Sequence, residues 1–331
     1  MHPTTPETLA PRGAGIFLYR ADSRHLLGLE GMSRDVLVAL LEDAQRYRTM
    51  LDGPGISSGE LAGITVCNAF FENSTRTRVS FELAERRLGA TAVSFASTES
   101  STNKGETLLD TLQVIQSMRV DLIVVRHPSS GASAFVARHL EAGVINAGDG
   151  QHEHPTQGLL DLLTLRQVWQ GRFEGRRIAI TGDIAHSRVA RSAVFGLVTL
   201  GAAVTLAGPC TLMPREVERL GVTVAGTLDA AMSGADAVMA LRLQHERMEQ
   251  GLLASLSEYA RAWGVNERRV RLMRPGAVVM HPGPMNRGVE LAPEVADGDR
   301  SVILEQVTNG VAVRCAVLKR CAAALESREA A

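Results

Sequence analysis

The chain has 331 residues, of which 45% are hydrophobic, 21% are charged and only 4% are aromatic. This composition is typical of a soluble globular protein, and the length is sufficient for two domains. The formal net charge of −1 argues against a nucleic-acid-binding surface, because contacts to the phosphate backbone require an excess of basic residues.

Cysteine usage and the N-terminal residues both predict a cytoplasmic protein. The cysteines have no CxxC spacing and no nearby histidine cluster, so we expect no structural zinc and predict four buried free thiols: Cys67, Cys210, Cys315 and Cys321. Residues 1–23 contain proline and glycine where a signal peptide needs an apolar core, which predicts a loose tail. Residues 192–214 carry no charge, but Gly201 and Gly208 interrupt them. A buried helix followed by a parallel strand is therefore predicted there, and no membrane span.

Strand-like apolar runs and helical patterns alternate along the chain. The apolar runs predict nine strands, at residues 63–71, 91–96, 120–126, 143–148, 176–183, 202–208, 221–226, 235–242 and 276–284. Helical patterns lie between most of them, for example at residues 106–118, 155–169 and 187–200. The alternation predicts an α/β protein with parallel sheets flanked by helices. Its length favours two lobes, with a boundary near Pro155, where a long helix begins.

Ligands of parallel α/β lobes bind beyond the carboxyl ends of the strands, so unusual polar residues at those places are the candidate binding groups. The first cluster, "STRTR" at residues 74–78, joins a strand to a helix. Asn73 or Ser74 can cap this helix, and its first-turn amides, with the hydroxyl and guanidinium groups, suit a phosphate. The alternative is an ordinary cap followed by solvated arginines. A nucleoside triphosphate is not indicated, because the GxxxxGK[ST] pattern is absent.

Two further clusters follow other strands of the first half. Arg126 closes a buried strand, where a guanidinium group is costly unless it meets an anion or reaches solvent. The segment "GDGQHEHPTQG" places His154 and Gln157 at the start of a helix whose first turn accommodates Pro155. His152 and His154 have a His-x-His spacing, but no third metal ligand is evident. We therefore expect no metal and predict that one histidine, His154, donates a hydrogen bond to the substrate.

The second half contributes two clusters of its own. Arg188 lies in "TGDIAHSRVARS", which lacks the GxGxxG glycines of a dinucleotide-binding turn. Arg242 and Gln244 occur in "ALRLQHER", and "MHPGPMNRG" contains the bond between Gly283 and Pro284, a candidate cis peptide in a tight turn.

Lys104 stands out because the chain otherwise uses arginine, with Lys319 as the only other lysine. It lies in a Ser/Thr-rich segment ahead of a predicted helix. A compact ammonium group in such a place indicates a specific requirement, although Lys319 is equally rare and is expected only to decorate the last helix.

Taken together, these motifs resemble the transcarbamylase family. "STRTR" and "HPTQ", at residues 154–157, are similar to the two signatures of that family. The segments "KGETLLDT", "RHP", "GDIAHSRVARS", "LRLQHER" and "HPGPMNRGVEL" resemble its aspartate-specific members, in the same order, from about Arg24 to about Leu325. Ornithine-specific members usually have cysteine in the second signature and a Ser-Met-Gly loop. Here Thr156 stands in the signature and no Ser-Met-Gly occurs. These differences favour aspartate as the substrate and leave ornithine as the alternative.

The resemblance implies transfer of the carbamoyl group of carbamoyl phosphate to L-aspartate, as in pyrimidine biosynthesis, without a cofactor. It implies a carbamoyl phosphate-binding domain at residues 24–155, completed by a C-terminal helix within 308–331, and an aspartate-binding domain at 156–307. Thr77, Arg126 and His154 would stabilise the reacting carbonyl oxygen. The implied carbamoyl phosphate-binding residues are Ser74, Thr75, Arg76, Thr77, Arg126, His154, Gln157, Gly283 and Pro284. The implied aspartate-binding residues are Lys104, Arg188, Arg242 and Gln244.

The family also implies a homotrimer in which the Lys104 segment reaches a neighbouring site. Whether regulatory or dihydroorotase-type chains join the trimer stays open. A non-catalytic scaffold of the same fold and a NAD-dependent dehydrogenase are the remaining alternatives. The filled motif positions argue against the first, and the missing dinucleotide glycines argue against the second.

Overall fold

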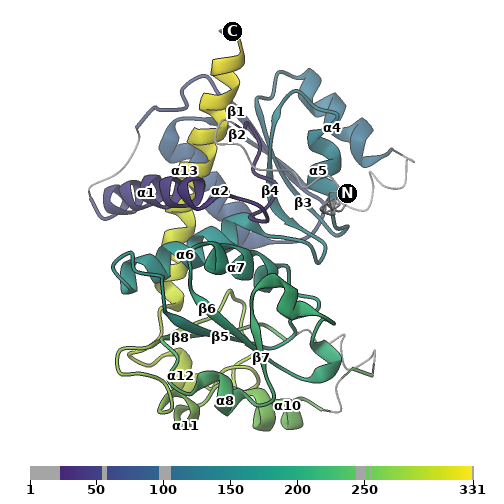
Figure 1. The fold of residues 1–331 in the computed structure, drawn as a ribbon. Coiled ribbons are helices and arrows are strands. Elements are labelled where there is room, and N and C mark those ends of the chain that lie inside the picture. The colour runs from purple at the N-terminus through teal and green to yellow at the C-terminus, as the bar shows by residue number, and fades with distance from the viewer. Residues whose placement is uncertain (1–22, 54–57, 97–105, 244–250, 253–254, 330–331) are drawn as a thin grey trace, which may run out of the picture.

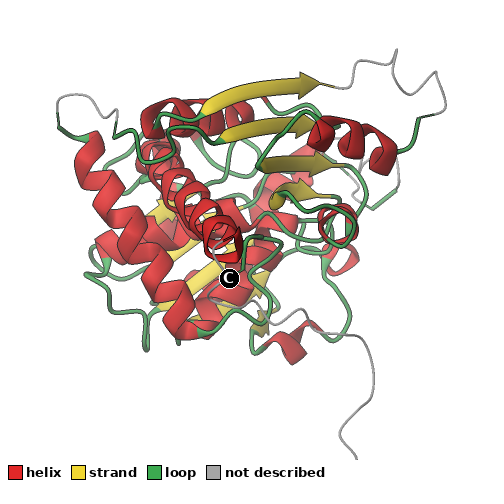
Figure 2. Ribbon diagram, turned by 90° about the horizontal axis from the view of Figure 1, so that it is seen from above, coloured by secondary structure: helices red, strands yellow, loops and turns green. Residues whose placement is uncertain are grey.

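The computed structural model describes residues 23–53, 58–96, 106–243, 251–252 and 255–329, which form two lobes stacked one on the other (Figure 1). The first lobe contains a four-stranded sheet in the order β2-β1-β3-β4, and the second a five-stranded sheet in the order β7-β6-β5-β8-β9. All strand pairs are parallel, as the alternating sequence pattern predicted. Figure 2 shows helices on both sides of the first sheet.

Each of the nine predicted apolar runs forms a strand. The strands are β1 (Thr65–Phe70), β2 (Thr91–Ala96), β3 (Leu122–His127), β4 (Gly143–Asp149), β5 (Arg177–Thr181), β6 (Ala203–Ala207), β7 (Thr223–Ala225), β8 (Ala237–Ala240) and β9 (Val278–Met280). The α-helices are α1 (Arg34–Leu51), α2 (Thr75–Leu88), α4 (Leu108–Ser117), α5 (Ala132–Ala137), α6 (Pro155–Val168), α7 (Arg188–Thr199), α8 (Leu228–Met232), α10 (Leu256–Trp263), α11 (Glu267–Val270), α12 (Pro293–Ala296) and α13 (Ile303–Glu329). Two short 3-10 helices, Cys210–Leu212 and Val217–Leu220, complete the second lobe.

Helix boundaries follow from local capping chemistry. Thr107 and Asp110 at the start of α4 exchange side-chain and backbone hydrogen bonds in a capping box. Pro155 occupies the first turn of α6, where its missing N–H has no intrahelical partner to lose. The uncharged segment 192–214 divides at Gly201, whose φ of 87° ends α7 before β6 begins. Within the described ranges, no helix combines the length and apolar character needed to cross a membrane.

Two helices join the lobes. In α6, every side chain from Pro155 to Leu165 is buried, because the helix packs against α7, α13 and β4. Helix α13 packs against α1, α2 and α6, so the predicted return of the C-terminal helix to the first lobe is confirmed (Figure 1). It begins at Ile303, and one hydrophobic cluster continues from the first lobe through both helices into the second. The division of the chain into domains at residue 155 stays a prediction.

The cysteine prediction is correct for three residues and wrong for one. Cys67, Cys315 and Cys321 are buried free thiols, whereas Cys210 is exposed. Cys210 follows Pro209 in a short 3-10 helix beyond the end of β6, where the chain has left the sheet and reaches the surface. The apolar character of residues 192–214 therefore does not extend burial to this position.

Candidate active site

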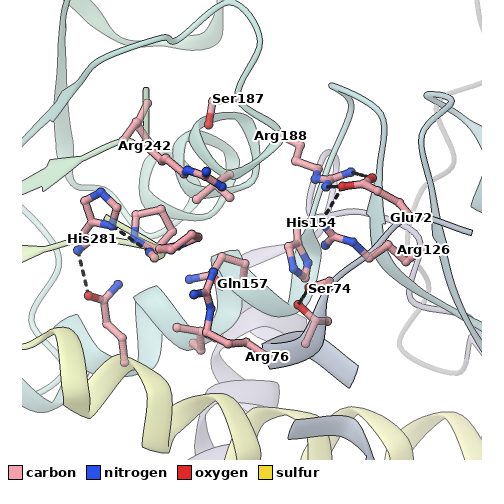
Figure 3. Close-up of a pocket in the computed structure, with 18 of the residues that line it drawn as sticks. Glu72, Ser74, Arg76, Arg126, His154, Gln157, Ser187, Arg188, Arg242 and His281 are labelled. Carbon is pink, nitrogen blue, oxygen red and sulfur yellow. Dashed lines mark hydrogen bonds and ion pairs between the residues drawn. The ribbon is translucent and has the colours of Figure 1, made fainter. Parts of the chain in front are cut away.

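A cleft of about 780 Å³ lies where the carboxyl ends of strands from both sheets face each other. Eleven of the predicted site residues line it: Ser74, Thr75, Arg76, Thr77, Arg126, His154, Gln157, Arg188, Arg242, Gly283 and Pro284. They come from six separate segments and both lobes (Figure 3). Lys104 and Gln244 lie outside the described residues.

The N-terminus of α2 opens into the cleft. Ser74 occupies the N-cap position, but its side chain makes no hydrogen bond to the helix amides. Its hydroxyl instead donates to Thr77 Oγ1 at 3.0 Å, so Ser74, one of the two predicted N-cap residues, holds that position without a side-chain cap bond. The first-turn amides of this 14-residue helix therefore keep their donors for another acceptor, at the end where the helix dipole favours an anion.

Glu72, which the motif analysis did not single out, bridges the two lobes. Its carboxylate accepts hydrogen bonds from Arg126 Nη2 at 2.7 Å and from Arg188 Nη2 at 2.6 Å and Nη1 at 2.9 Å (Figure 3). Burial alone would raise the pKa of Glu72, but the hydrogen bonds and charges of the two arginines outweigh it and hold that pKa below its usual range. In this structure the carboxylate of Glu72 is thus the anion that pairs with the guanidinium groups of both Arg126 and Arg188.

Gly148 allows these two arginines to approach each other. Its φ is 115°, a backbone conformation that residues other than glycine rarely adopt. A Cβ atom at this position would lie 3.0 Å from Arg126 Nη1 and 3.1 Å from Arg188 Nε. Any larger residue would therefore displace the guanidinium groups from the cleft wall.

His154 is an uncharged hydrogen-bonding group at the junction of the lobes. Its backbone N–H donates to Ser192 Oγ at 2.9 Å, and its Nδ1 is buried with no hydrogen-bond partner. Burial, followed by the charges of Arg126, Arg188 and Arg314, lowers the pKa of His154 well below 6.5. The neutral ring can donate one hydrogen bond into the cleft without acting as a strong acid.

Arg314, on α13, is a second residue that the motif analysis missed. Its Nη1 donates to the Gly310 carbonyl at 2.8 Å, its guanidinium carbon lies 5.0 Å from the centre of the Phe81 ring, and its Nε is buried without a partner. Burial, and then the charge of Arg126, lowers the pKa of Arg314 to about 9, so it stays cationic at neutral pH. No ion pair is recorded for it in the described part of the chain, whereas buried Arg126 has Glu72.

Arg76 and Arg242 approach each other across the cleft. Burial and the charge of Arg242 both lower the pKa of Arg76. The backbone of Gly283, with a φ of 61°, lies against the Arg76 guanidinium group, whose carbon would be 3.6 Å from a Cβ atom at this glycine. The peptide bond between Gly283 and Pro284 is cis, which confirms the candidate assignment from the sequence.

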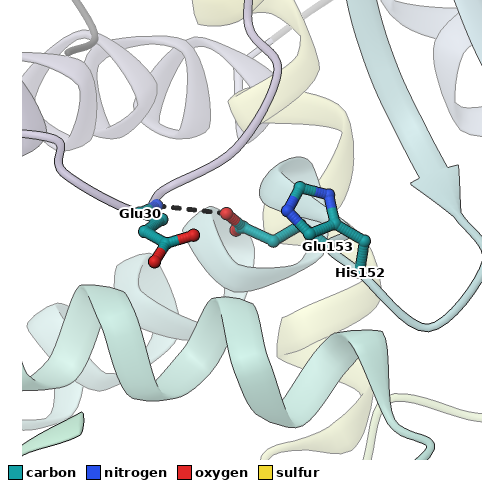
Figure 4. A group of neighbouring side chains, drawn as sticks. All are labelled: Glu30, His152 and Glu153. Atoms are coloured by element: carbon teal, nitrogen blue, oxygen red, sulfur yellow. Dashed lines mark hydrogen bonds between the residues drawn. The ribbon is translucent and has the colours of Figure 1, made fainter. Parts of the chain in front are cut away.

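The two histidines of the His-x-His motif do not share a site. His154 lines the cleft and His152 does not; His152 Nδ1 lies 3.2 Å from Asp149 Oδ2, and its ring lies beside Glu30 and Glu153 (Figure 4). These three side chains are close enough together to hold a cation, but the Glu153 carboxylate already accepts hydrogen bonds from the Leu29 and Glu30 amides. It also accepts one from Ser192. Glu153 therefore serves as a buried anchor between chain segments.

Comparison with known proteins identifies the class to which this cleft belongs. Residues 24–167 match the family model described as the aspartate/ornithine carbamoyltransferase carbamoyl-P binding domain, and residues 174–321 match the corresponding Asp/Orn binding domain. The chain belongs to the aspartate/ornithine carbamoyltransferase family, an enzyme family, as its motifs indicated.

Among individual relatives, the chain is similar to aspartate carbamoyltransferase catalytic subunits. That of Myxococcus xanthus is 56% identical over 300 residues, which are 91% of this chain and 100% of the relative. That of Gluconobacter oxydans is 55% identical over 298 residues, or 90% of this chain and 95% of the relative.

The chain is also similar to solved structures of an aspartate transcarbamoylase. Aspartate transcarbamoylase from Trypanosoma cruzi in complex with carbamoyl phosphate superimposes with a TM-score of 0.78 at 33% identity, covering 89% of this chain and 95% of that chain. The same enzyme in complex with carbamoyl aspartate and phosphate also gives a TM-score of 0.78 at 33% identity, covering 88% and 94%.

Proposed function

We propose that this protein transfers the carbamoyl group of carbamoyl phosphate to the amine of L-aspartate, giving N-carbamoyl-L-aspartate and phosphate for pyrimidine biosynthesis. The charge of the cleft carries the proposal. Its lining contains five arginines, Arg76, Arg126, Arg188, Arg242 and Arg314, against two carboxylates, Glu72 and Asp183. Such a site suits one phosphate and one dicarboxylate.

Phosphate binds at the N-terminus of α2 in this proposal. The first-turn amides, together with the hydroxyls of Ser74, Thr75 and Thr77, supply neutral donors. Arg76 and Arg126 supply charge. Because the Ser74 side chain does not cap the helix, no protein group has to be displaced from the amides.

The carbonyl oxygen of carbamoyl phosphate lies between Thr77, Arg126 and His154. These donors stabilise the negative charge that develops on that oxygen when the aspartate amine attacks. Neutral His154 suits this role because it donates without giving up its proton. Gln157 and the backbone carbonyls near Pro282 and Gly283 accept from the carbamoyl NH2 group.

Aspartate binds through its carboxylates to Arg188 and Arg242, with Gln244 and Lys104 completing the set. Arg188 holds Glu72 in a bidentate pair here, so a substrate carboxylate must share or replace that internal anion. Ornithine is disfavoured because it has only one carboxylate for these arginines, and because the ammonium group that does not react would need a free acid. Of the two lining acids, Glu72 is paired with arginines and Asp183 lies 2.7 Å from His186 Nδ1.

The reaction is a direct attack of the amine on the carbonyl carbon, followed by collapse of a tetrahedral intermediate and departure of phosphate. The departing phosphate can accept the proton of the amine. Catalysis then depends on positioning and on fixed charges, with no covalent enzyme intermediate and no resident cofactor.

The assembly that we propose is a cytoplasmic homotrimer in which Lys104 completes the site of a neighbouring subunit. Exposed apolar side chains in the first lobe support a subunit contact there: Val93 on edge strand β2 is 47% exposed, and Val114 and Met118 at α4 are 50% and 69% exposed. Regulatory or dihydroorotase-type chains are additional candidate partners, to be sought by measuring the mass of the native particle.

The direct test is an assay of product formation from carbamoyl phosphate with L-aspartate or L-ornithine, each with and without EDTA. We expect turnover of aspartate only, unaffected by the chelator. Robust carbamoylation of ornithine, or loss of aspartate turnover in EDTA, would contradict the proposal.

A further inference from the structure

A buried chain of hydrogen bonds starts at Gln157 and runs away from the cleft. Gln157 Nε2 lies 3.0 Å from Asp161 Oδ1, one turn further along α6. Gln306 Nε2, on α13, lies 2.7 Å from the same oxygen, and Gln306 Oε1 lies 3.0 Å from the backbone nitrogen of His281. His281 Nδ1 in turn lies 2.8 Å from the Gly283 nitrogen.

The donor and the acceptor of each of these hydrogen bonds can be assigned by starting from the backbone N–H of His281. Nitrogen and oxygen of a side-chain amide are interchangeable by geometry alone, but the backbone N–H of His281 can only donate. Gln306 must therefore present its oxygen to His281 and its NH2 group to Asp161. Asp161 Oδ1 therefore accepts a hydrogen bond from Gln306. The side-chain amide atom of Gln157 that lies next to Oδ1 is then best assigned as the NH2 nitrogen, which donates to the same oxygen. The oxygen of Gln157 is left for the cleft.

From this chain we propose that Asp161 is a positioning residue that selects the amino group of carbamoyl phosphate by holding the Gln157 carbonyl towards the cleft. The same carboxylate, acting through Gln306 and His281, fixes the Gly283 turn. Both acceptors that the proposed function assigns to the NH2 group are thus oriented from one buried atom. The inference rests on that assignment.

The environment of Asp161 is consistent with this role. The side chain is 1% exposed, and its Oδ2 is buried without a partner. Burial raises the pKa of Asp161 to about 7. A proton would occupy the unpartnered Oδ2, so Oδ1 remains an acceptor in both protonation states.

Acetyl phosphate provides the test, because it replaces the NH2 group of carbamoyl phosphate by a methyl group and keeps the phosphate and the carbonyl. The quantity measured is the inhibition constant of acetyl phosphate divided by the dissociation constant of carbamoyl phosphate. The wild-type protein should favour carbamoyl phosphate by about tenfold or more, since the analogue leaves the acceptors unpaired. Asp161→Leu should lose most of this preference, whereas Asp161→Asn, which keeps an oxygen for Gln157, should retain it.

Thr164→Val is the matched control. Thr164 lies one turn further along α6 and accepts from Asn309 of α13 at 2.9 Å, so its replacement perturbs the same helix pair without touching Gln157. It should leave the ratio unchanged, as a purely structural defect would. If Asp161→Leu does not fold, Asp161→Ala is measured in its place with the same expectation.

The Gln157→Ala variant distinguishes the role of Gln157 in substrate binding from the role of Asp161 in positioning Gln157. If this variant keeps the wild-type ratio, the role given to Gln157 in the proposed function is wrong. If it loses the preference while the Asp161→Leu or Asp161→Ala variant keeps it, Gln157 acts without Asp161 and the inference is overturned. Loss of the preference in both variants, with retention in Asp161→Asn and Thr164→Val, supports it.

Discussion

Replacing Glu85 by glutamine is expected to stabilise the protein at alkaline pH and to have little effect at pH 5. Glu85 lies on α2, fully buried, where one carboxylate oxygen accepts from Asn68 Nδ2 at 2.9 Å and the other has no partner. Burial raises the pKa of Glu85 to about 8, and the bond from Asn68 opposes that rise only in part. Glutamine keeps an oxygen for Asn68 and has no charge to bury.

The magnitude follows from the two pKa values of Glu85, about 8 in the folded protein and 4.5 ordinarily. Because the folded form binds the proton more tightly, the wild-type protein loses stability as pH rises from 4.5 to 8. A difference of one in pKa corresponds to about 1.36 kcal/mol, so the full loss is about 5 kcal/mol. About 3–4 kcal/mol of it falls between pH 5 and pH 8.

The assay is thermal or urea unfolding of the wild-type protein and the Glu85→Gln variant at pH 5, 6.5 and 8. The stability difference should grow with pH, reaching about 5 °C or more in Tm at pH 8. Glu42→Gln, a change on α1 at a side chain that is 61% exposed and is not among the groups that shift the pKa of Glu85, is the control and should give a difference that varies little. A constant difference for Glu85→Gln across this range would refute the reasoning.

Three further predictions concern the cleft. Arg242→Ala should weaken aspartate use while carbamoyl phosphate still binds, and Arg76→Ala should do the reverse, each by about ten- to a hundredfold; equal loss of both ligands in direct binding measurements would contradict the assignment of the lobes. Because the pKa of His154 is held well below 6.5, the pH profile of kcat should show no step from its protonation between pH 6 and 8, and a step that disappears in His154→Asn would be evidence against a neutral donor. Finally, mixing the nearly inactive Lys104→Ala and Arg76→Ala trimers through unfolding and reassembly should restore up to about one site per hybrid trimer; hybrids that form and stay at the activity of the parent variants would exclude a shared site.

The sequence was sufficient to predict the strands and the parallel α/β class, because the signals for these are local. Most of the strands, such as β3, β4 and β8, are short apolar runs that are buried on both faces and can be recognised without knowing their neighbours. The polar cluster at residues 74–78 and the residues of "HPTQ" lie at strand or helix ends, where polar groups cannot be explained by a core. The order of strands in each sheet, in contrast, depends on pairings between distant segments.

Glu72, Asp161 and Arg314 escaped notice for a related reason. Asp161 and Arg314 are single charges within the apolar stretches "GLLDLLTL" and "VAVRCAVL" of their helices, and that isolation was the available signal. Asp161 accepts a hydrogen bond from Gln306, which lies 145 residues away in the chain. No local sequence pattern could therefore predict that contact. Glu72 is an acid close to the cation cluster at residues 74–78, and its bridge to Arg188 forms only when the two lobes meet.

The return of α13 to the first lobe reverses the order in which the two halves can mature during translation. The first lobe precedes the second in the chain, yet its hydrophobic cluster includes Ala312, Val313 and Leu318, which are added after the strands of both sheets. All five strands of the second sheet precede α13 in the chain, so that sheet can assemble while the first lobe still exposes the surface that α13 will cover. Domains usually fold in the order of synthesis. Here the first lobe is synthesised before the second, but its core cannot close until the C-terminal helix has been added.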